Sequence, residues 1–135
     1  MRTSRIVQYN MDRLAMGEEH KLSDIIVNMV VPDYKMGNYA FGYIDKKDGA
    51  FVVRYVGRSD SDLKKEIKQQ MTTDRAKGCT HFKFSIASTK KEAFEKECRN
   101  YHDFGGRAYL HNENHPDKPD STKYKCPVEG CEYND

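Results

Sequence analysis

The chain contains no tryptophan, only four prolines and no long run of apolar residues. A membrane-spanning helix needs about 20 consecutive apolar residues, so we expect no membrane partner. Residues 1–5 lead into no apolar segment, which argues against a secretory signal and predicts a cytoplasmic protein. With 37% hydrophobic and 33% charged residues in a chain of 135, the composition predicts one modest core with long solvated faces.

The chain also has little excess charge of either sign, because its formal net charge is +2. This value neither requires nor excludes a nucleic-acid partner. Basic residues nevertheless gather on two predicted helices and in the segments before and between them: Arg54, Arg58, Lys64, Lys65, Lys68, Arg75, Lys90, Lys91 and Lys96. Such patches could neutralise a few phosphates, although charge runs are also typical of ordinary solvated faces.

Hydrophobic periodicity predicts an alternation of helices and strands. Residues 18–31 carry apolar residues at helical spacing and end before Pro32, although their β-branched side chains leave a strand as an alternative. Alternating residues in 39–45 and 51–57, separated by Asp48-Gly49, predict a β-hairpin. Further elements are expected as a helix at 63–71, a strand at 81–87 and a helix at 89–104.

The last helix has the clearest start, because Thr89 and Glu92 have the spacing of a capping box. The order of elements predicts an α+β fold with a small, hairpin-centred, three-stranded sheet flanked by helices. We assign residues 1–38 to an N-terminal arm and helix, with the flexible arm over 1–16. Residues 39–112 form the predicted main domain, and residues 113–135 a polar C-terminal tail with a possible zinc knuckle.

Two tyrosine segments carry the first candidate site. Tyr43 ends Phe41-Gly42-Tyr43, and Tyr55 begins Tyr55-Val56-Gly57 on the opposite strand of the predicted hairpin. Glu97 lies at the margin of the apolar face of the helix at 89–104. Two phenols beside a carboxylate suit metal-assisted phosphodiester hydrolysis. The plainer interpretation is two strand tyrosines and a surface glutamate.

This series of a tyrosine hairpin, a helix, a strand and a capped helix resembles the GIY-YIG nuclease family, over about residues 39–112. The resemblance implies that Tyr43 and Tyr55 lie around the attacking water and that Glu97 binds a single Mg²⁺ or Mn²⁺. It also implies a DNA partner. Asn112 is the better match to the family's distal asparagine, with Asn114 as the second candidate.

One position departs from the family. The resemblance implies an arginine in the helix at 63–71 that supports the scissile phosphate, and Glu66 occupies its place. A carboxylate there would repel phosphate. Lys65 or Arg58 could supply the positive charge instead, although lysine lacks the planar fork of arginine.

A second candidate site lies near the C-terminus. His111, His115, Cys126 and Cys131 could provide two nitrogens and two sulfurs to a zinc ion. The two cysteines are five residues apart, two more than in a tight zinc knuckle. A polar tail with incidental histidines and cysteines is the alternative.

The sequence therefore predicts a metal-dependent DNA endonuclease of GIY-YIG type. The alternative is a catalytically degenerate GIY-YIG-like module that binds nucleic acid or protein without cleavage, which Glu66 favours. A zinc-stabilised adaptor is a third interpretation, which requires that the tail binds metal.

Overall fold

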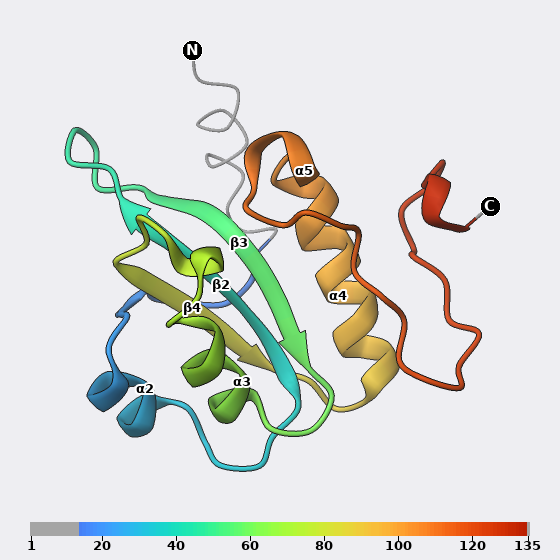
Figure 1. The fold of residues 1–135 in the computed structure, drawn as a ribbon, viewed down its shortest axis with the longest axis horizontal. Coiled ribbons are helices and arrows are strands. Elements are labelled where there is room, and N and C mark those ends of the chain that lie inside the picture. Colours follow the sequence, from blue (N-terminus) through green and yellow to red (C-terminus); the bar gives the residue numbers. More distant parts are fainter. Residues whose placement is uncertain (1–13, 135) are drawn as a thin grey trace.

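The sheet is built around the hairpin of β2 (Gly37–Ile44) and β3 (Phe51–Ser59). A computed structural model describes residues 14–134 (Figure 1). Strand β4 (His81–Ile86) pairs with the other side of β2, and the short β1 (His20–Lys21) pairs with β4. The strand order is β1-β4-β2-β3, and every pairing is antiparallel.

The α+β class is confirmed, but the expectation of three strands is wrong because β1 adds a fourth. A strand of two residues is too short to show alternation in the sequence. The helix expected at 18–31 is correspondingly shorter: α2 covers Asp24–Val30. It begins where the Ser23 side chain accepts a hydrogen bond from the amide of Ile26.

The turn between β2 and β3 confirms the predicted hairpin. Gly49 has a φ of 74°, which few residues other than glycine adopt readily. The Asp45 and Asp48 side chains accept hydrogen bonds from the amides of Lys47 and Ala50. These local contacts fix the loop without help from the core.

A β-bulge in β3 changes which side chains share a face. Phe41 pairs with Tyr55, whereas the next residue, Gly42, pairs with Val53, so Arg54 has no partner on β2. The extra residue turns Tyr55 to the face opposite Val53. Regular alternation along residues 51–57 would place Val53 and Tyr55 on one face.

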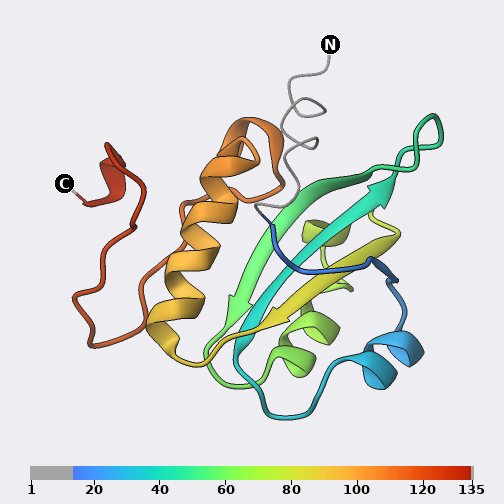
Figure 2. The ribbon, with the colours of Figure 1, turned by 180° about the vertical axis from the view of Figure 1, so that it is seen from behind.

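Helices cover the two faces of the sheet (Figures 1 and 2). On one face lie α2, α3 (Leu63–Gln70) and the 3₁₀ turn η2 (Asp74–Ala76). Their core consists of Val27, Val31, Tyr39, Phe41, Leu63, Ile67, Ala76 and Phe82. On the other face lie α4 (Lys90–Asp103) and α5 (Gly106–Tyr109). The core there consists of Leu14, Met16, Ala40, Phe51, Val53, Val56, Phe104 and Leu110.

The segment after α5 runs along the outer side of α4 (Figure 1). It ends in the 3₁₀ turn η3 (Glu132–Asn134) and packs Cys126 and Cys131 against Phe94 and Cys98 of α4. Most of the predicted arm, residues 1–13, lies outside the described residues. Leu14 and Met16, also assigned to that arm, are buried in the core.

Candidate functional site

A polar cavity of about 650 Å³ opens beside β3, the outermost strand on that side of the sheet. Its wall includes Tyr55 from β3, Arg75 from η2 and Glu97 from α4. Thr73, Asp74 and residues 111–117 complete the wall, which therefore also carries the carboxylates of Asp74, Glu113 and Asp117. The cavity therefore lies where both helical layers and the C-terminal segment meet one edge of the sheet.

Glu97 is a buried carboxylate on α4, where it follows the buried Ala93 by one helical turn and precedes Tyr101 by another. Its Oε1 accepts a hydrogen bond of 2.7 Å from Arg58, whose Nε also donates to Asp60. Burial raises the pKa of Glu97 from 4.5 to about 7, and the Arg58 guanidinium opposes that rise. A carboxyl that titrates near neutral pH beside a cavity is a typical functional candidate.

The second tyrosine near this cavity is Tyr39, which the sequence analysis missed. Its ring centroid lies 6.1 Å from that of Tyr55, and its side chain is fully buried. Gly57, opposite Tyr39 in the hairpin, makes room for the ring, since a Cβ atom there would lie 2.4 Å from Cζ of Tyr39. The segment Gly37-Asn38-Tyr39 mirrors Tyr55-Val56-Gly57, and this symmetry was the available signal.

Tyr43 does not join the other two predicted residues. It pairs with Val52 close to the hairpin turn and is 36% exposed. Four residues along a strand separate it from Tyr39 by about 13 Å. The expected convergence of side chains therefore holds for Tyr55 and Glu97, which line one cavity, and is wrong for Tyr43.

Tyr55 lies at the cavity wall with Arg75 above its ring, the guanidinium carbon 5.9 Å from the ring centroid. Burial raises the pKa of the Tyr55 phenol, and the Arg75 charge opposes this. The phenol therefore keeps its proton at neutral pH. Arg75, which the sequence placed only among the basic residues that could neutralise phosphates, is exposed, and its NH1 donates to Gln70.

The Glu66 side chain faces the buried Tyr39 and not the cavity. The Tyr39 hydroxyl donates a 3.1 Å hydrogen bond to its Oε2, and Glu66 is absent from the cavity wall. Burial raises the pKa of Glu66, while the Tyr39 hydrogen bond and the Arg75 charge lower it. Its neighbour Lys65 is exposed and also lies outside this cavity. Helix geometry places consecutive residues about 100° apart, so the two point in different directions.

Asn112 binds the backbone of β3. Its Oδ1 accepts from the amide of Val56 at 3.0 Å, and its Nδ2 donates to the carbonyl of Val56 at 2.8 Å. The backbone amide of His111 donates to the carbonyl of Arg54. Asn112 is therefore a buried positioning residue that fixes residues 111–117 against the cavity. Asn114, the second candidate, is an exposed part of the same wall.

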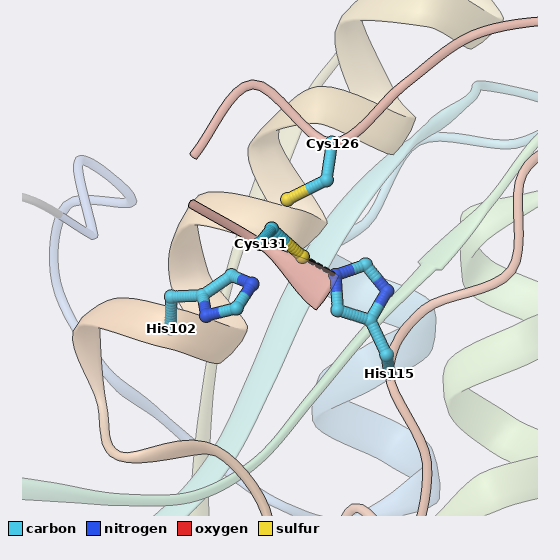
Figure 3. A group of neighbouring side chains, drawn as sticks. All are labelled: His102, His115, Cys126 and Cys131. Atoms are coloured by element: carbon cyan, nitrogen blue, oxygen red, sulfur yellow. Dashed lines mark hydrogen bonds between the residues drawn. The ribbon is translucent and has the colours of Figure 1, made fainter. Parts of the chain in front are cut away.

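A His-Cys cluster lies where the segment after α5 packs against α4. His102, His115, Cys126 and Cys131 place one nitrogen or sulfur each within 4.8 Å of one another (Figure 3). Three of these were predicted, but the second histidine is His102 and not His111. The ring of His111 instead contacts the carbonyl oxygen of Arg75 through Nδ1 at 3.0 Å. A group of two imidazoles and two thiols could bind a metal such as zinc.

No protein-family model matches the chain, and no match is found among curated proteins or solved structures. The geometry of the two sites is therefore what indicates a function. In residues 14–134, no helix has both the length and the apolar character that crossing a bilayer requires.

The cavity beside β3 combines three polar groups of different chemistry. Glu97 offers a carboxylate oxygen, Tyr55 a protonated phenol, and Arg75 a guanidinium. These can respectively hold a hard cation, donate a hydrogen bond and neutralise a phosphate. The His-Cys cluster has a different chemistry, because its soft ligands select zinc-like ions.

Proposed function

We propose that the protein hydrolyses phosphodiester bonds in DNA, with a divalent metal ion bound at the cavity beside β3. The observation that carries this proposal is that Glu97 and Tyr55 line one cavity with Arg75. DNA as the substrate rests on the resemblance of the element order to GIY-YIG nucleases. Within that resemblance we assign Tyr39 in place of Tyr43 as the partner of Tyr55, because the ring centroids of Tyr39 and Tyr55 lie 6.1 Å apart.

Glu97 fits the role of a ligand for Mg²⁺ or Mn²⁺. Arg58 donates a hydrogen bond to Oε1 of Glu97, and no donor from the described residues bonds to Oε2 of Glu97. A single carboxylate suits Mg²⁺, which keeps several waters and takes further ligands from phosphate oxygens. When bound, the ion would stabilise charge on the phosphate and acidify a water molecule.

Tyr55 orients a water molecule in this proposal. Because burial raises the pKa of its phenol, the hydroxyl stays protonated and acts as a hydrogen-bond donor and acceptor. Tyr39 is fully buried and its hydroxyl donates a hydrogen bond to Glu66. Its ring is therefore held in place and supports the Tyr55 ring from the core side. Tyr39 also keeps the Glu66 carboxylate away from the cavity.

Arg75 is the best candidate to bind the phosphate. Arg58 bonds to both Asp60 and Glu97, and Lys65 lies outside the cavity. Arg75 is exposed at the cavity wall, and its planar guanidinium can pair with two phosphate oxygens. Its charge offsets the absence of an arginine at position 66.

A cleavage assay with matched variants tests the proposal. Untagged protein is incubated with single-stranded, linear, supercoiled and branched DNA, with Mg²⁺ or Mn²⁺. Tyr55→Phe and Glu97→Gln should each lower the cleavage rate by about 100-fold or more. Tyr43→Phe removes the same atom outside the cavity and should leave the rate unchanged. Equal losses in Tyr43→Phe and Tyr55→Phe would reject the assignment.

Arg75→Ala should also lower the rate by about 100-fold or more, with Lys65→Ala as its matched control. If the wild-type protein cuts none of these substrates with either ion, the hydrolytic function is wrong.

A second candidate function is nucleic-acid binding without cleavage. The hydrogen-bonded ion pair of 2.7 Å between Arg58 and Glu97 favours this second function, since a carboxylate that is already paired is a weaker metal ligand. Binding that weakens steeply with salt, together with no cleavage, would support this alternative. Arg75→Ala should then reduce the salt dependence of binding, whereas Glu97→Gln should not change it.

A further inference from the structure

We propose that His102, His115, Cys126 and Cys131 bind one structural Zn²⁺ ion, which fastens the C-terminal segment to α4. This proposal does not depend on the hydrolytic function, because the four ligand residues do not include Glu97, Tyr55 or Arg75. His102 belongs to the last turn of α4, and the other three ligands belong to the segment after α5.

The spacing of the four ligand atoms is close to that of a tetrahedral site. Zinc binds sulfur at about 2.3 Å and nitrogen at about 2.0–2.1 Å, so ligand atoms lie roughly 3.3–3.8 Å apart. Nε2 of His115 and Sγ of Cys131 are already 3.3 Å apart, and all four atoms lie within 4.8 Å of one another. The remaining distances are therefore at most about 1.5 Å longer than the tetrahedral values.

The contacts of the His115 ring leave Nε2 available as the metal-binding nitrogen. Nδ1 lies 2.8 Å from the carbonyl oxygen of Pro116, which can only accept, so Nδ1 carries the proton. Nε2 then has a lone pair that points at Cys131 (Figure 3). A ligand histidine whose other nitrogen donates to a carbonyl is typical of zinc sites.

His102 supplies an independent observation. Its Nε2 is a buried nitrogen with no hydrogen-bond partner among residues 14–134. Buried polar atoms without partners are rare, because losing water without compensation is unfavourable. A metal ion at the centre of the cluster would satisfy this atom (Figure 3).

The local backbone holds the two cysteines in position. Asn134 donates to the carbonyl of Cys126 and accepts from its amide, at 2.8 and 2.9 Å. The amide of Cys131 donates to the carbonyl of Val128, and Gly130 has a φ of 79°. This turn brings both sulfurs to one side of the segment despite the four residues between them.

The donor set indicates a structural role. Four protein ligands leave no open position for water or substrate. The segment has few apolar contacts, since its core consists of Phe94, Cys98, Cys126 and Cys131 with Tyr124 and Val128 beside them. His115 also lines the cavity beside β3, so the same residue would connect the zinc site to the cavity wall.

Metal analysis of untagged protein tests the proposal directly. Protein produced with added zinc should contain about one zinc per chain, and the apoprotein should take up one Co²⁺ with the absorption bands of a tetrahedral dithiolate site. His102→Gln and Cys131→Ser should lose the metal. His111→Gln should retain it, which separates this ligand set from the one predicted by sequence.

Three results would overturn the proposal: wild-type protein without stoichiometric zinc, metal retained in both His102→Gln and Cys131→Ser, or a disulfide between Cys126 and Cys131 in the native protein. The Co²⁺ spectrum of the wild-type protein decides the matter even if a variant fails to fold. Hydrogen exchange before and after zinc removal should show faster exchange in residues 113–134 and little change in the sheet. DNA cleavage is not used as a readout, so failure of either proposal leaves the other testable.

Discussion

The raised pKa of Glu97 can be tested by replacing the residue with glutamine, which keeps the size of the side chain and removes its titration. The folded-state pKa of about 7 lies above the ordinary value of 4.5. Between these two values the folded protein holds a proton that the unfolded chain has lost. The protonated carboxyl therefore contributes its full stabilisation below about pH 4.5, and this contribution is lost as the pH rises through about 7.

The size of the effect follows from the same values. One pKa unit corresponds to about 1.4 kcal/mol, so a rise from 4.5 to about 7 corresponds to about 3 kcal/mol. Glu97 is buried, so solvent screens little of this contribution. The free energy of unfolding of the wild type, minus that of Glu97→Gln, should thus fall by about 3 kcal/mol between pH 4.5 and pH 8.

Guanidinium unfolding at a series of pH values, without added Mg²⁺ or Mn²⁺, measures this difference. Far-UV circular dichroism is the suitable signal, because the chain has no tryptophan. Other titrating groups, including the His-Cys cluster, are common to both proteins, so their contributions cancel in the difference between the two free energies of unfolding. Glu95→Gln on the same helix is the control, since its carboxylate pairs with the exposed Lys91. A difference that stays constant, or that grows with pH, would show that Arg58 keeps Glu97 ionised throughout and would refute the reasoning.

Three further variants test individual contacts by chemical unfolding. Asn112→Ala removes both hydrogen bonds to the buried Val56 backbone and should destabilise the protein by about 2–4 kcal/mol; a loss below about 1 kcal/mol would mean that water replaces the amide. Gly57→Ala forces a Cβ atom against the buried Tyr39 ring and should cost about 1–3 kcal/mol, part of which Tyr39→Leu should restore. Thr89→Ala removes the hydrogen bond to the amide of Glu92 and should cost about 1 kcal/mol, whereas Thr89→Ser should be nearly neutral.

The sequence predicted the elements whose signals are local. The hairpin turn, the start of α4 and the α3 helix each depend on neighbouring residues, and the structure confirms them. One detail differs at α4, where the Glu92 carboxylate accepts from Ser88 and not from Thr89. The strand β1 was missed because its two residues are fixed by pairing with β4.

The candidate sites were harder to predict because they depend on register and on distant contacts. The bulge at Arg54 determines which face of the sheet Tyr55 occupies, and no local sequence pattern predicts this bulge. Tyr39 was overlooked because a tyrosine in a strand is typical of an ordinary core residue, and the mirrored order of Gly37-Asn38-Tyr39 and Tyr55-Val56-Gly57 is a short signal. His102 was overlooked because it belongs to a helix, whereas its partners lie 13 to 29 residues further along the chain.

The contacts of residues 111 and 112 with β3 have a consequence for solubility. An outermost strand presents free amides and carbonyls, and another chain can add to them and start aggregation. Here the amide of His111 and the side chain of Asn112 occupy the outward groups of Arg54 and Val56. Residues 111–112 thus act as a short substitute strand that ends the sheet. Removing the chain after Leu110 would uncover these groups and leave β3 able to pair with a second molecule.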